Sequence, residues 1–551
     1  ATSSNKLINA QVPVTFNNLT FSGTSGGWNL QNAATTTVSN TFAMTAGTLS
    51  GTGNVAISSG ALSGNGTITM TGGTVQIAST GNLGSNTEWQ FNNLTLGAGS
   101  VGATTKTGTA TTTILGVLRV NTSHTLNAGS GGWELAGGGT PFIVNGTFDV
   151  DTAPFYYTSN SATNVEDATY DYLVLAPSAA GSPTYTIQPG SSLAASALTI
   201  GDGTNPVTVT ADANDPAVDI SDDVLIQANA TYVNSSLGGF SVGGSWTNQG
   251  TFTHSGGAVT FDSGDTGETI NAGNSSFYDL IFNSASGGWT VSENATSSRH
   301  ATLTNASSFT VASGRALAVG GTFTNAVGGG ATNWEGSTLF LNSGTSYAAN
   351  TKTITDTYGT LLIGATTDVR MWNSTSTVTA LDTTGSLYSQ DHNAVDGSLY
   401  IWGEYVKASG SDYWSYETDF DGTTLSGGSV RQVNVRLASS SSVTSSGGVF
   451  DIIGTTTAST TIANQGDGRY SVVVSGGSFN AEYYRFRNLN QDGLQLSGSP
   501  TVTTISHGDF ESDVPEGNAM LTVAGTVIDA NQLKTFTANR FRACTRPASS
   551  A

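Results

Sequence analysis

Short bursts of alternating apolar and small polar residues recur along the chain, each cut by Gly, Ser or Asn. Between residues 47 and 77 the bursts are Gly47–Leu49, Asn54–Ile57, Gly60–Leu62, Thr67–Met70 and Gly73–Ile77. A period of two is typical of strands with one buried face, and these bursts are too short for helices. The pattern therefore predicts an all-β chain of short strands, about ten residues apart.

A longer unit repeats as well. Phe16–Phe21 followed by Ser25–Trp28 matches Phe277–Phe282 followed by Ser286–Trp289, in both order and spacing. Partial copies occur at Phe91–Leu96, Ser130–Leu135, Tyr170–Leu175 and Tyr358–Ile363. Such repeats are typical of proteins that stack one small structural unit on the next.

Closely spaced short strands fit two architectures, an antiparallel sandwich or a coiled solenoid. A sandwich needs closed cores with defined ends, whereas this chain shows no linker and no break in composition over most of its length. In a solenoid each coil buries an apolar stripe against the next, and Thr, Ser, Asn and Gly serve the turns and outer faces. We therefore predict an all-β, parallel β-helix solenoid with irregular turns.

Three regions are expected along this solenoid. Residues 1–384 form the β-helical repeat region. Residues 385–425 are dense in Tyr and Trp and are expected to form an aromatic-rich insertion or hairpin. Strand bursts such as Tyr470–Val474 resume in residues 426–551, which are expected to form a C-terminal β-helical segment.

Composition and charge limit the class of protein. Apolar residues make up 37% and charged residues 10%, with 70 Gly, but the aromatic share of 9% argues for a buried core rather than disorder. The net charge is −21, from 17 Lys and Arg against 38 Asp and Glu. This acidity argues against nucleic acid and anionic lipid as partners, because the attraction to phosphate is missing.

Other sequence features concern export and the membrane. The only cysteine, Cys544, cannot form an internal disulfide. No apolar run is long enough to span a bilayer, so we expect no membrane insertion. The first residues, 1–4, contain neither the basic nor the apolar region of a signal peptide, so we expect that any leader has been removed.

The strongest catalytic candidates are Glu482, His507 and Asp509, which lie near Arg485 and Arg487. In a β-helix, residues one coil apart can align on one face, and paired carboxylates with an arginine are typical of glycosidases and polysaccharide lyases. The alternative is a surface ladder of ion pairs, since the two arginines alternate as strand residues do. We favour the ladder, and we expect no enzymatic activity.

Calcium is the only cofactor that the sequence suggests. Clustered carboxylates on turns can supply the oxygen ligands that Ca²⁺ prefers. The candidates are Asp212, Asp215, Asp219, Asp222 and Asp223. Their spacing matches neither an EF-hand nor a calcium β-roll, and acidic turn residues account for them without a metal.

Aromatic residues are candidates for stacking on sugar rings. Those in the aromatic-rich segment are Trp402, Trp414 and Tyr416. The repeated Ser-Gly-Gly-Trp sequences hold Trp28, Trp133 and Trp289. Because these three recur in step with the repeat, we favour a structural role in which Gly-Gly forms a sharp corner and Trp covers a layer of the coil.

The motifs Phe277–Phe282 with Ser286–Trp289, and the tail from Tyr413–Tyr416 through Asp451–Gly454 to Tyr483–Asn488, carry a family resemblance. The chain resembles the Ser/Thr/Gly-rich β-strand-repeat proteins of the bacterial cell surface, notably those of the Patescibacteria (candidate phyla radiation). More loosely, it is similar to filamentous-haemagglutinin-type adhesins and the pectate-lyase-like β-helix superfamily. The resemblance implies a right-handed β-helix, export, and a role in attachment or surface structure.

Together these features predict an extracellular structural or adhesive surface protein. The partners we expect are further copies of the chain, joined through end or edge contacts into a filament, and host or environmental glycans. The alternative is a carbohydrate-active β-helix enzyme or glycan-binding module, including one of the phage tail-spike type.

Overall fold

The computed structural model describes most of residues 6–342 and 434–543, and between these stretches it describes only strands. The residues outside the description are 1–5, 32–33, 85, 191, 328–329, 343–356, 364–368, 372–379, 384–386, 390–398, 402–403, 408–410, 415–417, 422–433, 438–439, 441, 446–448, 458, 465–466, 514–518, 531–534 and 544–551.

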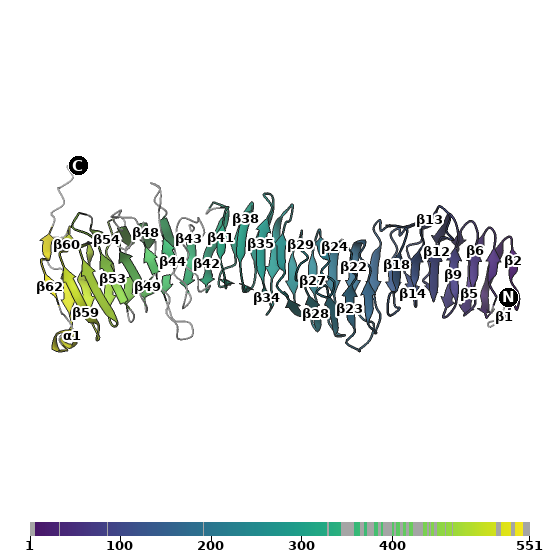
Figure 1. The fold of residues 1–551 in the computed structure, drawn as a ribbon, viewed down its shortest axis with the longest axis horizontal. Helices are drawn as coiled ribbons and strands as arrows, with labels where there is room; N and C mark the ends of the chain where they lie inside the picture. Colours follow the sequence, from purple (N-terminus) through teal and green to yellow (C-terminus); the bar gives the residue numbers. More distant parts are fainter. Residues whose placement is uncertain are drawn as a thin grey trace. The chain divides into compact units, whose positions relative to one another are not determined.

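The chain is all-β, with 56% of its residues in strands. Its parallel sheets stack as a β-solenoid of about 18 turns, which confirms the predicted fold class (Figure 1). In the described part of the chain, helix is limited to α1 (Gly525–Asp529). The sandwich alternative would require antiparallel pairs, whereas the described strands pair in parallel from the first coils (β1 with β3) to the last (β60 with β63).

Three smaller sheets run beside the long one, each contained in one part of the chain. The first has the strands β2 (Val14–Phe16), β4 (Thr36–Val38), β6 (Val55–Ile57), β9 (Thr74–Ile77), β12 (Asn93–Leu96), β15 (Leu118–Val120) and β18 (Phe142–Val144). The second has β21 (Thr163–Val165), β23 (Thr184–Ile187), β25 (Val207–Thr210), β28 (Ala230–Val233) and β31 (Thr251–Thr253). The third has β44 (Val369–Met371), β47 (Leu399–Ile401), β50 (Thr418–Asp421), β53 (Val449–Ile453), β56 (Ser478–Glu482), β59 (Thr501–Ser506) and β62 (Phe536–Thr537).

The remaining strands supply the other walls of the coils. Up to residue 261 they are β1 (Lys6–Ile8), β3 (Leu19–Leu30), β5 (Phe42–Gly51), β7 (Leu62–Ser63), β8 (Thr67–Met70), β10 (Gly81–Gly84), β11 (Trp89–Phe91), β13 (Gly102–Lys106), β14 (Thr112–Ile114), β16 (His124–Asn127), β17 (Trp133–Leu135), β19 (Thr147–Asp149), β20 (Pro154–Tyr157), β22 (Thr169–Leu175), β24 (Ser192–Ile200), β26 (Ala217–Ile220), β27 (Val224–Ile226), β29 (Phe240–Val242), β30 (Trp246–Asn248) and β32 (Ala258–Phe261). Beyond it they are β33 (Thr266–Asn271), β34 (Ser276–Phe277), β35 (Asp279–Asn283), β36 (Gly288–Val291), β37 (Ala295–Ser297), β38 (Ala301–Asn305), β39 (Ser308–Val311), β40 (Ala316–Val319), β41 (Phe323–Asn325), β42 (Thr332–Leu341), β43 (Thr357–Ile363), β45 (Ala380–Thr383), β46 (Leu387–Ser389), β48 (Glu404–Lys407), β49 (Ser411–Trp414), β51 (Asn434–Leu437), β52 (Ser442–Ser445), β54 (Thr460–Asn464), β55 (Tyr470–Val474), β57 (Tyr484–Arg487), β58 (Leu489–Leu496), β60 (Asp509–Ser512), β61 (Leu521–Val523) and β63 (Arg540–Ala543).

A coil consists of three short strands joined by turns, as residues 93–135 illustrate. The strands β12, β13 and β14 make one coil, and each pairs in parallel with its counterpart β15, β16 or β17 in the next. Leu94 lies opposite Leu118, and Thr112 opposite Trp133. Because the register is in phase, inward residues stack on inward residues and outward residues on outward ones.

The chain divides into two compact units. The first comprises residues 1–263 and 273–275, and the second comprises residues 264–272 and 276–551. The segment 385–425, for which an insertion or hairpin was expected, contributes β46 to β50 to the second unit. These strands pair in parallel with strands of neighbouring coils, as β46 does with β43 and β49. They are therefore strands of the solenoid sheets.

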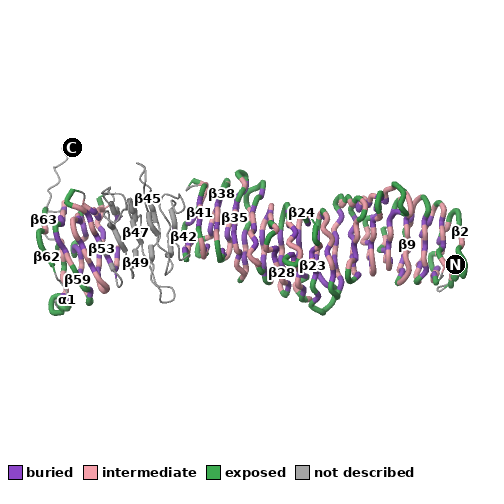
Figure 2. Tube along the Cα trace, in the orientation of Figure 1, coloured by how far each residue is buried: buried purple, intermediate pink, exposed green. Residues whose placement is uncertain are grey.

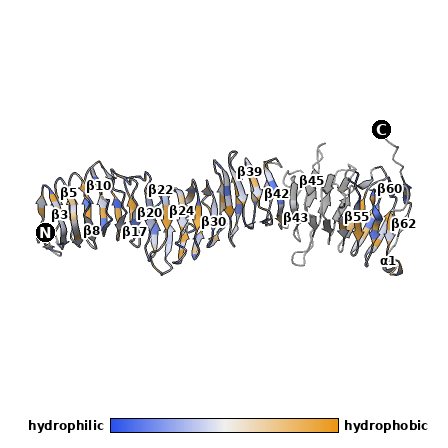
Figure 3. Cartoon of the chain, turned by 180° about the vertical axis from the view of Figure 1, so that it is seen from behind, coloured by the Kyte–Doolittle hydropathy of each residue, from blue (hydrophilic) through white to orange (hydrophobic). Residues whose placement is uncertain are grey.

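The core is a set of apolar columns that run from coil to coil. Buried and less buried residues alternate along the strands, as do hydrophobic and hydrophilic ones (Figures 2 and 3). One column in the first unit contains Phe91, Ile114, Leu135, Tyr157, Leu175, Ile200 and Ile226, all of them buried. Each such side chain contributes about 1.5–3 kcal/mol through its burial.

Side chains on the turns tie each coil to the next. Asn54 Oδ1 accepts a hydrogen bond from Thr74 N (2.9 Å), and Asn93 Oδ1 accepts one from Val117 N (2.8 Å). Asn294 does the same for Ala316 N at 3.0 Å. The bonded residues are 20 to 24 residues apart, which is one coil. These amides satisfy backbone donors that the strand ladders leave unpaired at the turns.

Candidate functional site

The three predicted catalytic residues lie on neighbouring coils of the second unit. Glu482 ends β56, His507 lies between β59 and β60, and Asp509 begins β60. His507 Nδ1 is 3.8 Å from Glu482 Oε1, and its ring stacks on Tyr483 with a centroid distance of 4.9 Å. Asp509 instead accepts two hydrogen bonds from Arg540, at 2.6 and 2.9 Å. The structure thus brings Glu482 and His507 together and holds Asp509 in a separate ion pair.

His507 lies at a corner that is repeated from coil to coil. Its φ is 55°, and Tyr483 and Ala538 have φ values of 51° and 56°. In the register of β57, β60 and β63, these three residues occupy the same position in successive coils. A left-handed backbone at a residue other than glycine is uncommon, so this corner is a specific feature of the last described coils.

Two columns of side chains run across β57, β60 and β63, and the sign of the charge alternates along each column. In the first, Asp509 lies between Arg485 and Arg540. In the second, Glu511 lies between Arg487 and Arg542. We call the outward side of these three strands the arginine face.

Ion pairs form both within and between the two columns of the arginine face. Arg485 Nη2 is 3.8 Å from Asp509 Oδ2, and its Nε is 3.6 Å from Glu511 Oε1. Arg487 Nε is 3.2 Å from Glu511 Oε2. These contacts form a ladder of ion pairs between β57 and β60.

The charges of the arginine face are layered. The side chains of Asp509 and Glu511 are 5% and 13% exposed, whereas those of Arg487 and Arg540 are 53% and 63% exposed. The carboxylates therefore lie close to the backbone, and the guanidinium groups cover them. The solvent-exposed groups of this face are therefore positively charged, although the chain as a whole is acidic.

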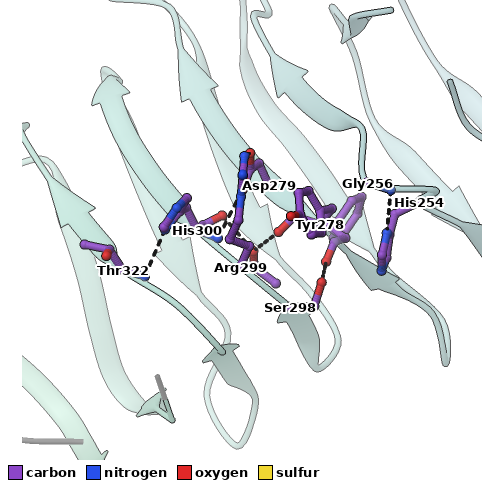
Figure 4. A network of polar contacts seen from close by, with 10 residues as sticks. His254, Gly256, Tyr278, Asp279, Ser298, Arg299, His300 and Thr322 are labelled. Atoms are coloured by element: carbon purple, nitrogen blue, oxygen red, sulfur yellow. Dashed lines mark hydrogen bonds and ion pairs between the residues drawn. The ribbon is translucent and has the colours of Figure 1, made fainter. Parts of the chain in front are cut away.

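A second charged network, which the sequence did not reveal, lies on β35 and the turn before β38 (Figure 4). Arg299 Nε donates to Asp279 Oδ1 at 2.7 Å, and its Nη2 donates to Oδ2. The Arg299 guanidinium also lies 4.4 Å from the centre of the Tyr278 ring. His300 N donates to Asp279 Oδ1 (3.2 Å), and Thr322 N donates to His300 Nδ1 (3.1 Å). The network spans three coils.

Replacing Asp279 with Asn tests this network. Burial raises the pKa of Asp279, but the hydrogen bonds from Arg299 and His300 outweigh burial and hold the pKa below its usual value. Its stabilising contribution is therefore present above the unfolded-state pKa and is lost as the pH falls through the folded-state pKa. We expect Asp279→Asn to cost about 1–3 kcal/mol at pH 7, measured by urea unfolding. The exposed Asp149→Asn is the control, and equal effects of the two substitutions would contradict the prediction.

The five calcium candidates are not gathered into one site. Asp212 and Asp215 follow β25, Asp219 lies in β26, and Asp222 and Asp223 precede β27. Asp215 Oδ1 accepts hydrogen bonds from Ser236 N (2.7 Å) and Leu237 N (3.1 Å), and Asp223 Oδ1 accepts one from Ser245 N (2.8 Å). In the described residues, no three His, Cys, Asp or Glu side chains are grouped so that they could hold a metal ion.

The aromatic candidates divide into two sets. Trp402 and Tyr416 lie outside the described residues, and Trp414 is described only as the last backbone position of β49. Of the Ser-Gly-Gly-Trp sequences, Trp133 and Trp289 are fully buried in the core. A Cβ on Gly131 would meet the Gly108 carbonyl oxygen at 2.6 Å, so glycine is required there by the close approach of the neighbouring coil.

A buried lysine is a further feature that the sequence analysis missed. Lys106 ends β13 opposite Leu83 and is 4% exposed. Its Nζ donates to Gly132 O at 2.6 Å and lies 5.0 Å from the centre of the Trp133 ring. Burial lowers the pKa of Lys106 from 10.5 to about 7.

His124 is a second buried titratable group in the same coils. Its Nε2 lies 2.9 Å from Thr104 Oγ1, and burial lowers the pKa of the imidazole. Lys106 lies on β13 and His124 on β16, and both side chains are buried in the core. Two basic groups are therefore held in an apolar interior, which favours their neutral forms.

Comparison with protein-family models, with curated proteins and with solved structures found no match for this chain. Among the described residues, no helix has the length and apolar character needed to cross a membrane. The parallel β-solenoid fold is thus the part of the predicted resemblance that the structure supports.

Proposed function

We propose that the protein is an extracellular structural or adhesive surface protein of the bacterial β-strand-repeat type. The observation that carries the proposal is the combination, in the described residues, of apolar columns inside the coils with outward positions that are small and polar. In β8 and β25, for example, Thr residues face outward between buried apolar residues. Such rows of hydroxyl groups can bond to hydroxyl-rich surfaces, while the ladders between coils keep the rows in place.

Surface location can be tested on the cells that produce the protein. We expect antibodies raised against residues 86–190 to label intact cells, and external protease to remove that labelling. The control is a cytoplasmic protein, which should be labelled only after lysis. Detection of the chain only inside intact cells would refute the proposal.

Self-assembly into a filament is the second part of the proposal. Phe541 stacks on Phe510 with a centroid distance of 5.0 Å, and it is 51% exposed. Stacking of another strand layer against this ring would bury the exposed apolar area.

Sedimentation velocity over a range of concentrations tests assembly of this chain. We expect species larger than the monomer, and we expect Phe541→Ser to reduce them. Ile528 on α1 is 61% exposed, so Ile528→Ser is a matched control that should leave assembly unchanged. Monodisperse monomers at high concentration would contradict this part of the proposal.

A carbohydrate-active role is the second candidate, and the contact between Glu482 and His507 favours it. A carboxylate beside an imidazole can exchange protons with a bound sugar, and the stacked Tyr483 ring lies next to them. The test is incubation with a panel of acidic and neutral polysaccharides, measuring new reducing ends and unsaturated products. Turnover that is lost in Glu482→Gln would support this candidate, and no turnover on the whole panel would exclude it.

A further inference from the structure

The arginine face differs from the rest of the chain in charge. Only 17 of the 551 residues are Lys or Arg, yet four of them share the outward side of β57, β60 and β63. They are Arg485, Arg487, Arg540 and Arg542. A fifth, Arg469, lies beside them and pairs with Asp513 and Ser512. On the three strands of the face, the four arginines stand against two carboxylates, Asp509 and Glu511, so the charge of the face is positive.

The spacing of the arginines suits an extended ligand better than a small one. Residues two apart on a strand are about 7 Å apart, and residues two coils apart are separated by about 10 Å. The guanidinium groups therefore form an open grid and do not converge on one point. A small anion would reach one or two of them, whereas a linear polymer with repeated negative charges would reach several at once.

The ion pairs beneath the grid leave guanidinium donors available. A guanidinium has five N–H donors. Arg487 uses Nε toward Glu511, and Arg540 uses Nε and Nη2 toward Asp509. The pairs also fix the orientation of these side chains, so less conformational entropy is lost when a ligand binds. Guanidinium forks match carboxylate and sulfate groups, which accept two parallel hydrogen bonds.

We propose that the arginine face binds a linear acidic polysaccharide through its carboxylate or sulfate groups. This assignment deepens the proposed adhesive function and rests on it. Charge density favours a polysaccharide over nucleic acid, because a duplex carries a charge every 1.7 Å or so and is repelled strongly by a chain with a net charge of −21. An anionic bilayer is disfavoured because Phe541 alternates with Arg540 and Arg542 on β63, so its exposed ring belongs to the core side.

Binding can be measured with the purified full chain on immobilised probes. The probes are heparin for sulfate groups, polygalacturonate for carboxylate groups, and dextran as the neutral control. We expect binding to at least one acidic probe and none to dextran, with affinity that falls steeply between about 50 and 300 mM NaCl. The variant Arg487→Gln/Arg542→Gln should lose about tenfold in affinity and show a weaker salt dependence.

Two further variants keep the test decisive. Arg315 is exposed and lies outside the face, so Arg315→Gln should bind as the unmodified chain does. Arg487→Lys/Arg542→Lys keeps both charges and protects the fold, and it should lose about two- to fivefold in affinity because the forks are lost. Far-ultraviolet circular dichroism confirms that each variant is folded.

Several outcomes would overturn the inference. These are absence of binding to both acidic polysaccharides at low salt, an equal loss in Arg315→Gln, and tighter binding to poly(U) RNA or to phosphatidylserine vesicles. Self-association that disappears in the Gln variant, without polysaccharide binding, would instead assign the face to a second copy of the chain. Surface labelling of cells is measured separately, so failure of polysaccharide binding is distinguishable from failure of the proposed location.

Discussion

Replacement of Lys106 by Met is expected to stabilise the coils around β13 and β16 at pH 7. The folded chain must hold the Lys106 side chain in an apolar interior, which lowers its pKa to about 7 from 10.5. Met is similar in length and carries no charge, although it leaves Gly132 O without the hydrogen bond from Nζ. The pKa difference outweighs this bond, and we expect a net gain on the order of 3 kcal/mol.

The lowered pKa of Lys106 also predicts how the stability of the folded chain changes with pH. Between pH 7 and 10.5 the unfolded chain binds more protons at Lys106 than the folded chain does, so stability rises with pH across this window. The rise should be about 2–3 kcal/mol between pH 7 and 9. In Lys106→Met it should be absent, so that the two proteins converge at higher pH.

Urea unfolding at pH 7 and 9, with hydrogen exchange of peptides from residues 102–135, measures both effects. Lys6 is exposed on β1, so Lys6→Met is the control and should change neither the midpoint nor its pH dependence. A Lys106→Met protein that is less stable than the unmodified chain at pH 7 would show that the lysine is not a net cost to folding.

The second large effect is expected at the repeated tryptophans. Trp289 is 1% exposed and packs against Phe282 with a centroid distance of 5.3 Å. Trp289→Ala removes a large side chain from between the coils, and we expect a loss of about 3–5 kcal/mol. Trp28 occupies the same place in its Ser-Gly-Gly-Trp sequence and packs against Phe21 at 4.9 Å, but it is only partly buried.

Trp28→Ala is therefore the matched control, and its cost should be clearly smaller than that of Trp289→Ala. Thermal unfolding followed by calorimetry would record both, because repeat proteins can unfold in stages and the affected transition should be resolved. If the two substitutions had equal cost, burial between coils would not be what the repeat preserves.

Much of the fold could be predicted from the sequence because its signals are local. The alternation in Thr67–Met70 marks a strand with one buried face, and the structure has β8 at those residues. The choice of a solenoid over a sandwich also followed from the sequence, since neither linkers nor composition breaks interrupt the bursts. The Gly-Gly pairs were interpreted as corners. At Gly131, however, the requirement comes from a carbonyl group of the neighbouring coil, which no local pattern reports.

The candidate site was predicted only in part, because no single segment of the sequence specifies which residues of one coil pair with which residues of the next. Arg485, Arg487 and Asp509 were grouped in the sequence analysis, and they do lie together, with Glu511 between the two arginines. Arg540 and Arg542 were missed, although they show the same spacing of two on their strand. They belong to the site only because β63 pairs with β60 over an interval of 31 residues. The interval between paired residues varies along the chain, for example 24 residues between Leu94 and Leu118 and 30 between Glu404 and Asn434, so the sequence alone does not give it.

Lys106 shows a second limit of prediction from sequence. A lysine at the end of the burst Gly102–Lys106 would ordinarily face water, but the phase of the strand places it inward, opposite Leu83. Alternation identifies the two faces of a strand, but it does not show that every residue on the inward face is apolar. Asp279 and Arg299 illustrate the same point, since a distance of 20 residues in the sequence becomes direct contact only once the length of the coil is known.

The amide side chains that reach from one turn to the next have a consequence for how the chain tolerates length changes. Each such bond, like that from Thr74 N to Asn54, needs only the adjoining coil. Duplication or loss of one complete coil would therefore preserve every partner, whereas insertion of a few residues within a strand would shift inward side chains outward. Variation by whole turns is the form of divergence that this architecture permits at least cost.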